Sequence, residues 1–324
     1  MDRAKQPSLL GDLARAVVRL LATAAGACLL VFVAIEVSIP GGFRAVILPN
    51  GVDQASARDL AVVEEFHLDR PVVVRWGHWL VDLGQGDLGR SIQNGLPVTE
   101  LIVPRLPISL QFVAVSVLGT VVLGIPLGLL AAARDGRPGG RLLNLLFGLS
   151  QSIPVFITPV FLIWLFALRL QWLPAAGWVR PSTSITGNLR TLALPATALI
   201  LAEVGIVARL VRADVLRILE SDVVATAMGK GLPRRYILAR HALRPASLGV
   251  LNVVGLNIGS VLAGTVLVEL IFGIGATGQL LLEASRNRDL YLLLALTLYM
   301  VTVYVVINTV VDVLIRVLDP RIGR

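Results

Sequence analysis

The sequence has 324 residues, of which 56% are hydrophobic and only 15% are charged, and its mean hydropathy is +0.80. Because about a quarter of the residues in soluble domains are charged, this composition excludes an ordinary soluble domain and indicates an integral membrane protein. The formal net charge of +8 is what basic loops between apolar spans produce, so we do not expect nucleic-acid binding. Cys28 is the single cysteine, which excludes an intrachain disulfide and a cysteine-based metal site.

Six apolar segments are long enough to cross a bilayer as helices, for which about 20 residues suffice. The first exceeds the length of a signal-peptide core, so we expect it to be retained as a span. Pro126, Pro154 and Pro159 can break or kink the second and third spans. The sequence therefore predicts an all-α integral membrane protein with six transmembrane helices, at residues 16–39, 107–133, 142–170, 192–211, 248–272 and 290–318.

The distribution of Lys and Arg predicts the orientation of these spans. The two termini and the loops on their side of the membrane carry 18 of these residues, whereas the two short loops on the other side carry only four. The long first loop is discounted because long loops translocate largely regardless of charge. We therefore expect both termini to be cytoplasmic.

Residues 40–106 form the long first loop, which we expect to be a small extracytoplasmic subdomain. Ser56 to Asp59 resembles a capping box and predicts a short amphipathic helix that ends near Phe66. A Gly- and Pro-rich passage follows it. The expected organisation is a cytoplasmic N-terminus with the first span (1–39), this subdomain (40–106), a core of the other five spans with a cytoplasmic loop at 213–247 (107–318), and a cytoplasmic tail (319–324).

Two sequence motifs known for nucleotide binding were considered, of which one is present and one is absent. Gly273, Gly275 and Gly278 spell the dinucleotide fingerprint G-x-G-x-x-G, but the fingerprint requires a preceding strand in a soluble unit, and here it follows a span. A turn that caps or re-enters the membrane is the better interpretation. No phosphate-binding loop of the form G-x-x-x-x-G-K-[ST] occurs in the sequence, and the three histidines are too scattered to predict a metal site.

Ionisable residues within spans are costly and are candidates for function. Glu203 and Glu269 are candidates for the translocation path, with a structural role as the alternative. Asn308, Asp312 and Arg316 recur every four residues on one face of the last span, and we interpret them as a stabilising ladder.

Small residues mark one face of the fifth span. Gly255 and Gly259 are spaced for close approach to another helix, and Gly264 continues the face. Close helix packing is the plain interpretation, and a lining of the translocation path is the alternative.

The segment from Asp222 to Pro245 is a long basic stretch between the fourth and fifth spans. Its six basic or histidine side chains stand against one acid, and its first part is rich in Ala and Gly. Such a segment can approach a partner protein closely or contact lipid headgroups.

Several motifs together resemble the inner-membrane permeases of the dipeptide, oligopeptide and nickel ABC importers. They are GDLGRS at 86–91 with RLP at 105–107, ATAMGKG at 225–231 followed by HALR at 241–244, Glu269-x-x-Phe272, and LDPRI at 318–322. The resemblance covers nearly the whole chain, and the segment at 225–231 is similar to the family's EAA loop.

The resemblance implies a type I ABC importer permease fold and a set of partners. It implies that the basic segment is a coupling helix that docks on a cytoplasmic ATPase, with contacts from Ala225, Thr226, Ala227, Met228, Gly229, Lys230, Gly231, His241 and Arg244. It further implies a second homologous permease, two ABC ATPase subunits or domains that use ATP and Mg²⁺, and an extracytoplasmic solute-binding protein. This chain itself is expected to bind no cofactor and to catalyse no reaction.

Three functions remain open at this point. The first is a permease subunit of a bacterial inner-membrane importer of di- or oligopeptides, or, within the same family, of nickel chelates, glutathione or another small solute. The second is an ion-coupled carrier that uses Glu203, Glu269 and Asp312. The third is a membrane scaffold that recruits a partner through the basic segment.

Overall fold

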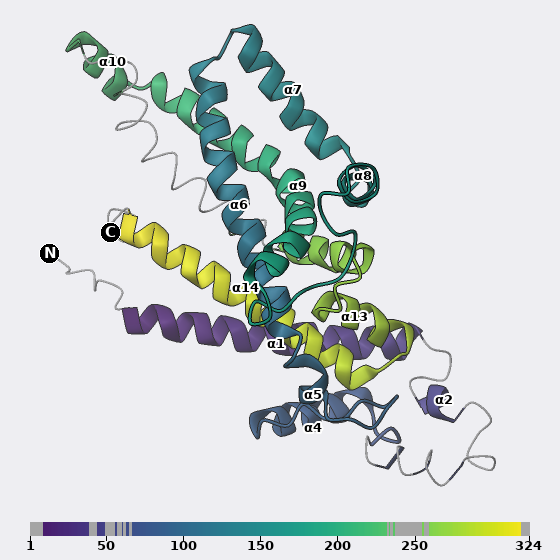
Figure 1. Ribbon diagram of the computed structural model, residues 1–324. Coiled ribbons are helices and arrows are strands. Elements are labelled where there is room, and N and C mark those ends of the chain that lie inside the picture. Colours follow the sequence, from purple (N-terminus) through teal and green to yellow (C-terminus); the bar gives the residue numbers. More distant parts are fainter. Residues whose placement is uncertain are drawn as a thin grey trace, which may run out of the picture. The chain divides into compact units, whose positions relative to one another are not determined.

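Every regular element in the described part of the computed structural model is a helix (Figure 1). The structure describes residues 9–38, 44–48, 67–231 and 259–318, together with residues 56, 60, 63, 64, 233, 236 and 255. Within these ranges, one isolated antiparallel bridge joins Arg90 and Pro97. The expected all-α fold is thus found.

Four helices are long and apolar enough to cross a membrane: α1 (Leu9–Ser38), α6 (Leu106–Ala133), α9 (Ile185–Leu219) and α14 (Leu290–Leu318). They lie at the first, second, fourth and sixth predicted spans. The fourth is longer than predicted, because Ser184 caps its start by accepting a hydrogen bond from the Gly187 N–H at 3.0 Å. The C-terminal part of α9 contains polar residues, which hydropathy had placed outside the span.

The third predicted span is not one continuous helix, and this part of the prediction was wrong. α7 (Pro138–Ser152) is followed by α8 (Ile157–Leu162), which continues as a π-helix (Ile163–Arg169), and the two parts are bent by 106°. Ile153 at the break is extended, with ψ of 122°, because the ring of Pro154 disfavours helical geometry in the residue before it. Pro126 leaves α6 unbroken.

The remaining predictions fall partly outside the described residues. Of the fifth predicted span, the structure describes Gly255 and a short apolar helix, Gly259–Ile271, which leads into α13 (Thr277–Arg286). Most of the helix expected from Ser56 to Phe66 also lies outside the described residues.

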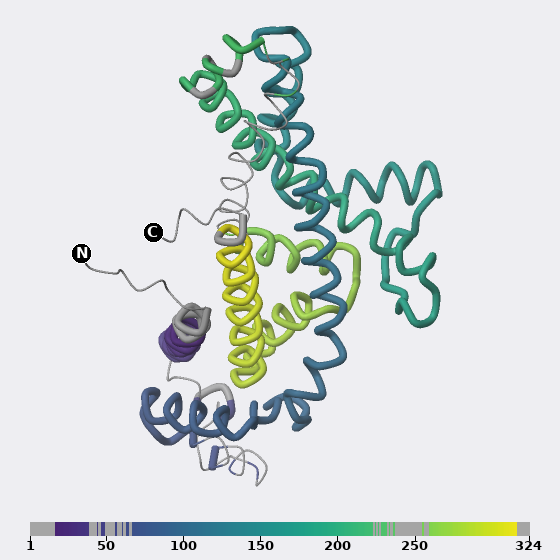
Figure 2. The backbone as a smooth tube through the Cα atoms, turned by 90° about the vertical axis from the view of Figure 1, so that its left-hand side faces the viewer, coloured from purple at the N-terminus to yellow at the C-terminus, as the bar shows by residue number. Residues whose placement is uncertain are grey.

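The chain divides into two compact units. Of the described residues, those between 108 and 279 and between 306 and 318 form the first unit, and those between 9 and 107 and between 280 and 305 form the second. In the first unit, α6, α7 and α9 run side by side (Figures 1 and 2). A core from α6, α8, α9 and the 259–271 helix includes Phe112, Leu199, Val268 and Phe272.

Glycines allow the helices of the first unit to approach closely. A Cβ atom placed on Gly128 of α6 would lie 2.5 Å from the Ala208 carbonyl oxygen and 2.5 Å from Val211 Cβ, both on α9. Gly124, one turn earlier, lies against the Val207 side chain of α9, and Gly205 of α9 lies against the Phe147 backbone of α7. These contacts bring α9 into direct backbone packing with both of its neighbours.

The second unit is built around α1, α4 (Val72–Gly84), α5 (Val98–Ile102) and the first part of α14. Phe32 of α1 and Trp79 of α4 are buried and meet edge to face, with ring centroids 6.5 Å apart. Cys28, Val98 and Leu294 belong to the same core. The short α2 (Arg44–Ile47) places Ile47 against it.

We predict that Gly128→Ala destabilises the chain by about 1–3 kcal/mol, because the added methyl group overlaps backbone atoms that cannot move independently. The measurement is the apparent melting temperature of the purified chain in detergent. Gly148→Ala in α7 is the matched control, because a Cβ atom there meets nothing within 4 Å and Ala favours the helix. Equal melting temperatures for the two variants would contradict the proposed close packing.

Candidate functional site

The segment that resembles a coupling helix forms a short helix, α10 (Asp222–Gly229), directly after α9. Val224 is buried against Ile218 and Leu219 at the end of α9. Thr226 Oγ1 donates to the Asp222 carbonyl at 2.8 Å. α10 is therefore attached to α9 by a small apolar contact and keeps a defined orientation relative to that helix.

The remaining described side chains of α10 are exposed and could contact a partner. Thr226, Met228, Gly229, Lys230 and Gly231 are exposed, and Met228 is 56% exposed. The side chains of Ala225 and Ala227 and the whole of His241 and Arg244 lie outside the described residues. An exposed methionine among glycines suits a protein contact better than a solvated loop.

Gly231 ends this helix in the left-handed conformation. Its φ is +77°, and its N–H donates to the Met228 carbonyl at 2.9 Å. Residues with a Cβ atom adopt this geometry at a cost, so glycine is the favoured residue just after a helix. The glycine that the resemblance singled out is thus required by the local backbone.

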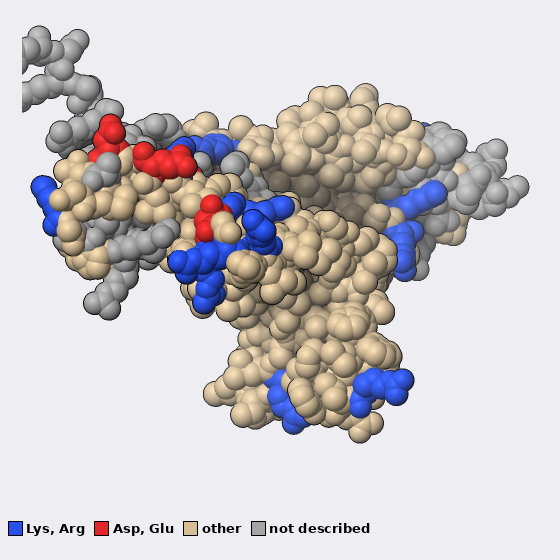
Figure 3. All heavy atoms as spheres, turned by 90° about the horizontal axis from the view of Figure 1, so that it is seen from above, with Lys and Arg blue, Asp and Glu red and all other residues tan. Residues whose placement is uncertain are grey.

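Charged side chains cluster at the C-terminal part of α9, beyond its apolar segment. Arg212 donates to Asp135, in the turn between α6 and α7, at 2.6 Å, and Arg217 pairs with Asp214 at 2.8 Å. These pairs are partly solvated, so each contributes little to stability. Figure 3 shows Lys and Arg side chains in separate groups on a surface that is otherwise mainly uncharged.

Glu269 is fully buried near the end of the 259–271 helix. Its Oε2 accepts hydrogen bonds from the N–H groups of Gly278 at 2.6 Å and Gln279 at 3.2 Å, in the first turn of α13. The first N–H groups of a helix have no partner within that helix and attract negative charge. The carboxylate therefore joins the end of one helix to the start of the next.

Two hydroxyl groups complete this network. Ser109 Oγ of α6 donates to Glu269 Oε1 at 3.1 Å and accepts from the Thr277 N–H at 3.0 Å. It also lies 2.7 Å from Thr277 Oγ1. The three side chains thus fix the 259–271 helix and the start of α13 against α6.

The G-x-G-x-x-G motif forms the turn between these two helices. Gly273 and Gly275 have φ of +57° and +71°, and the Gly275 N–H donates to Gln279 Oε1 at 3.1 Å. A Cβ atom on Gly278 would lie 2.7 Å from Glu269 Oε2, so a residue without a side chain is needed there. A helix rather than a strand precedes the motif, so the turn is found as expected, and its place at the membrane stays a prediction.

The structure places the other intramembrane candidates at separate points. Glu203 is half-buried on α9. Gly255 lies against α14, where a Cβ atom would be 3.0 Å from Asn308 Oδ1, which is the close approach that the small residues predicted. Gly259 and Asp312 are exposed in this chain, and the side chain of Arg316 lies outside the described residues. A role of Glu203, Glu269, Gly255 and Gly259 in a translocation path stays a prediction.

In the second unit, the GDLGRS motif docks on the start of α14. Ser91 Oγ donates to Asp289, which is buried and also accepts from the N–H groups of Ile92 and Leu292 at 3.3 and 3.4 Å. Gly89 has φ of +83°, and a Cβ atom there would lie 2.8 Å from Tyr291 Cδ1. The motif is therefore a tight loop shaped to fit the end of a helix.

The sequence reasoning missed a second polar cluster, in the first unit. Gln111 Nε2 of α6 donates to Asn188 Oδ1 at 2.6 Å, and Trp178 Nε1 donates to Gln111 Oε1 at 3.2 Å. Asn188 is buried, and its Nδ2 donates to the Val179 carbonyl at 2.7 Å. The sequence signal for this cluster was Gln111, near the start of an apolar span, because a polar side chain there needs hydrogen-bond partners.

We predict that Glu269→Leu destabilises the chain by about 2–5 kcal/mol, because it leaves several buried donors without an acceptor. Glu269→Gln should lower the stability less, because its amide oxygen can still accept some of these hydrogen bonds. The measurement is again the apparent melting temperature of the purified chain. Glu203→Leu is the control, because the Glu203 carboxylate has no hydrogen bond among the described residues. An equal effect at both positions would contradict the assigned network.

Comparison with known proteins identifies close relatives of the chain. Residues 124–324 match the family described as the binding-protein-dependent transport system inner membrane component. The oligopeptide transport system permease protein OppB of Salmonella typhimurium is 34% identical over 268 residues, which cover 81% of this chain and 85% of that protein. OppB of Escherichia coli K12 is 34% identical over 259 residues, which cover 80% and 83%.

The fold agrees with these sequence matches. A chain of the inward-facing MetNI methionine ABC transporter superposes with a TM-score of 0.56 at 18% identity, over 68% of this chain and 96% of that chain. The helical arrangement is that of a type I ABC importer permease, and the chain is a multi-pass inner-membrane protein. This chain therefore belongs to the family of binding-protein-dependent transport system inner membrane components.

Proposed function

We propose that this chain is a permease subunit of an ABC importer, and that it provides the translocation path for di- or oligopeptides. The observation that carries the proposal is the 34% identity to two oligopeptide permeases over at least four fifths of this chain. In the proposed complex, a solute-binding protein delivers the peptide, and ATP hydrolysis in partner subunits drives its import. The assembly would contain a second homologous permease and two ATPase subunits or domains.

The absence of a phosphate-binding loop from the sequence supports a division of labour. Any work derived from ATP must reach this chain through a protein contact, and ATP and Mg²⁺ would be bound by the partner ATPases. α10 suits that contact, because Val224 anchors it on α9 while Thr226, Met228 and Lys230 remain exposed. We assign α10 with Gly231 as the coupling element, on the cytoplasmic side together with both termini.

An ion-coupled carrier is the weaker candidate. Such a carrier needs a carboxylate that can exchange an ion or a proton during transport. Glu269 has both carboxylate oxygens in hydrogen bonds to Ser109 and to the amides of α13. Release of that carboxylate would free the start of α13, so Glu269 suits a fixed structural role better than a cycling one.

The test is uptake of radiolabelled trialanine into proteoliposomes that contain this chain with its partner permease, ATPases and binding protein. We expect uptake that requires ATP and the binding protein. Uptake driven by an ion gradient without ATP, or no peptide uptake in an assembled complex, would contradict the proposed function.

We predict that Gly231→Val abolishes most of this ATP-dependent uptake while the chain still inserts and assembles. A β-branched residue at φ of +77° is strained, so the end of α10 must rearrange. Gly231→Asn is the matched control, because Asn tolerates the left-handed conformation, and it should retain most uptake. Normal uptake by Gly231→Val would exclude the docking assignment.

The proposed orientation predicts opposite labelling of two exposed positions. In a Cys28→Ala background, Thr226→Cys should react with a membrane-impermeant maleimide only after the cells are permeabilised. Gln85→Cys, which is exposed after α4, should react in intact cells. Labelling of Thr226→Cys from outside would reverse the topology.

A further inference from the structure

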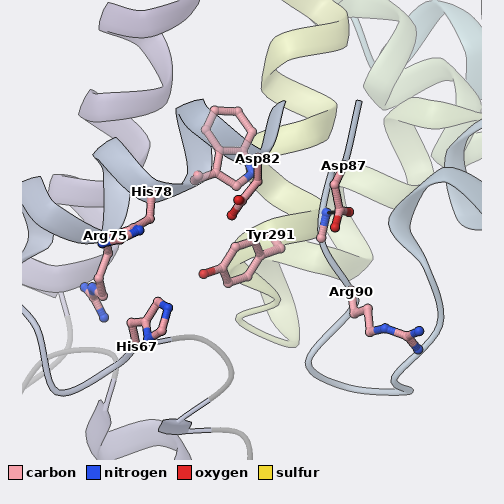
Figure 4. A pocket seen from close by; sticks show the side chains of 9 residues that line it. His67, Arg75, His78, Asp82, Asp87, Arg90 and Tyr291 are labelled. Atoms are coloured by element: carbon pink, nitrogen blue, oxygen red, sulfur yellow. Dashed lines mark hydrogen bonds between the residues drawn. The ribbon is translucent and has the colours of Figure 1, made fainter. Parts of the chain in front are cut away.

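The turn between α6 and α7, in the first unit, concentrates charges of one sign. Residues 134–141 include Arg134, Arg137 and Arg141 and a single acid, Asp135. A pocket of about 150 Å³ between α4 and the start of α14, in the second unit, is different, because Figure 4 shows acidic and basic side chains together around it. The turn is therefore the stronger candidate for a ligand of one charge, which must be an anion.

The acid of this turn is already paired. Arg212 of α9 donates to Asp135 at 2.6 Å. Arg134, Arg137 and Arg141 are exposed, and none of them has an ion pair with another described residue. The turn thus carries three positive charges that the described part of the chain does not neutralise.

The local backbone keeps these three cations close to one another. The Arg137 N–H donates to the Arg134 carbonyl at 3.0 Å, which closes a turn whose end Cα atoms lie within about 7 Å of each other. Arg141 follows Arg137 by four residues in α7, a rise of about 6 Å. Arg137 and Arg141 also stand at the N-terminal end of α7, where the helix dipole disfavours cations. An anion in contact with them would offset this repulsion.

α7 exposes a stripe of leucines that begins beside the arginines. The four side chains are between 49% and 59% exposed, and their spacing places them on one face of the helix. They are Leu142, Leu145, Leu146 and Leu149. The stripe lies in the third predicted span, so lipid acyl chains are the expected surroundings of this face.

The start of the leucine stripe has an arginine on each side. Arg141 precedes Leu145 by four residues, so the two side chains are neighbours on the surface of α7. On the other side, a Cβ atom on Gly139 would lie 3.4 Å from Arg134 Cδ, and Gly139 precedes Leu142 by three residues. Arg134 therefore reaches from the end of α6 to the leucine face of α7.

We propose that this region binds one anionic phospholipid, with its phosphate between Arg134 and Arg141 and an acyl chain along the leucines of α7. Arginine forms strong, charge-assisted hydrogen bonds to phosphate. Basic sites where helices meet the membrane surface are suited to anionic headgroups. A free anion would use the arginines and leave the leucine stripe uncovered, whereas a phospholipid matches both parts. This binding does not depend on which solute the chain transports.

The experiment is native mass spectrometry of the full chain, released from micelles that contain equal amounts of dioleoyl-phosphatidylglycerol and dioleoyl-phosphatidylcholine. The two lipids share the phosphate and the acyl chains and differ in net charge. We expect one phosphatidylglycerol to be retained about tenfold more often than phosphatidylcholine, which corresponds to one additional charge-assisted contact. Equal retention of the two lipids overturns the proposal. Neither ATP nor a partner subunit is needed, so the result is independent of the uptake test.

Paired variants separate a defined site from general attraction to a basic surface. Arg134→Gln combined with Arg141→Gln should lower retention of phosphatidylglycerol about tenfold. Arg286→Gln combined with Arg288→Gln is the matched control, because it removes two exposed charges from the second unit, and it should leave retention unchanged. An equal loss in both pairs overturns the proposal. If the first pair fails to fold, Arg141→Gln alone decides by the same comparison.

Two further measurements distinguish the lipid from other anionic partners. An excess of inorganic phosphate should leave the phosphatidylglycerol bound, because free phosphate gains nothing from the leucine stripe. Displacement by phosphate would assign the arginines to a soluble anion and overturn the lipid assignment. The same follows if the Arg134 and Arg141 pair of variants keeps its lipid but no longer co-purifies with the partner ATPases, since the arginines would then belong to that protein contact.

Discussion

The direct packing of α9 on α6 and α7 is the contact on which the first unit depends. In a membrane, apolar side chains gain little from leaving lipid, so helices associate through close fit and polar contacts. Gly124 and Gly128 of α6 and Gly205 of α9 remove the side-chain layer at these crossings. At Gly128 and Gly205 the glycine lies directly against the backbone of the neighbouring helix, so a displacement of α9 relative to its neighbours requires the whole interface to move.

Polar side chains stabilise irregular parts of the backbone by accepting hydrogen bonds from its N–H groups. The turn from Gly273 to Gly275 exposes the first N–H groups of α13, and Glu269 accepts from two of them. At the bend after α7, the lost helical hydrogen bonds follow from Pro154, which has no N–H to donate. Broken helices are tolerated in membranes only where other protein groups satisfy the backbone. The buried Glu269 carboxylate does so at the start of α13.

Hydropathy predicted where four of the spans lie because apolar length alone identifies them. It could not predict the 106° bend, although Pro154 and Pro159 indicated that the third span was interruptible. Glu269 was identified as a costly intramembrane acid, but its partner Ser109 is 160 residues away. The ion pair of Arg75 with Glu36 likewise joins residues far apart in the sequence, one on α4 and one on α1. Such pairs depend on the packing of whole helices, which no local pattern in one sequence contains.

α10, which we propose as the coupling element, depends for its form on a small apolar contact and a glycine more than on its charge. Val224 attaches α10 to the end of α9, and Gly231 allows the chain to turn away directly after it. In the proposed importer, a partner that moves α10 would also move α9, because the apolar contact joins the two helices. The glycine crossings would pass that movement to α6 and α7 without a compressible layer of side chains. The basic residues contribute less to this transmission, since solvated charges at the surface interact weakly and are screened by salt.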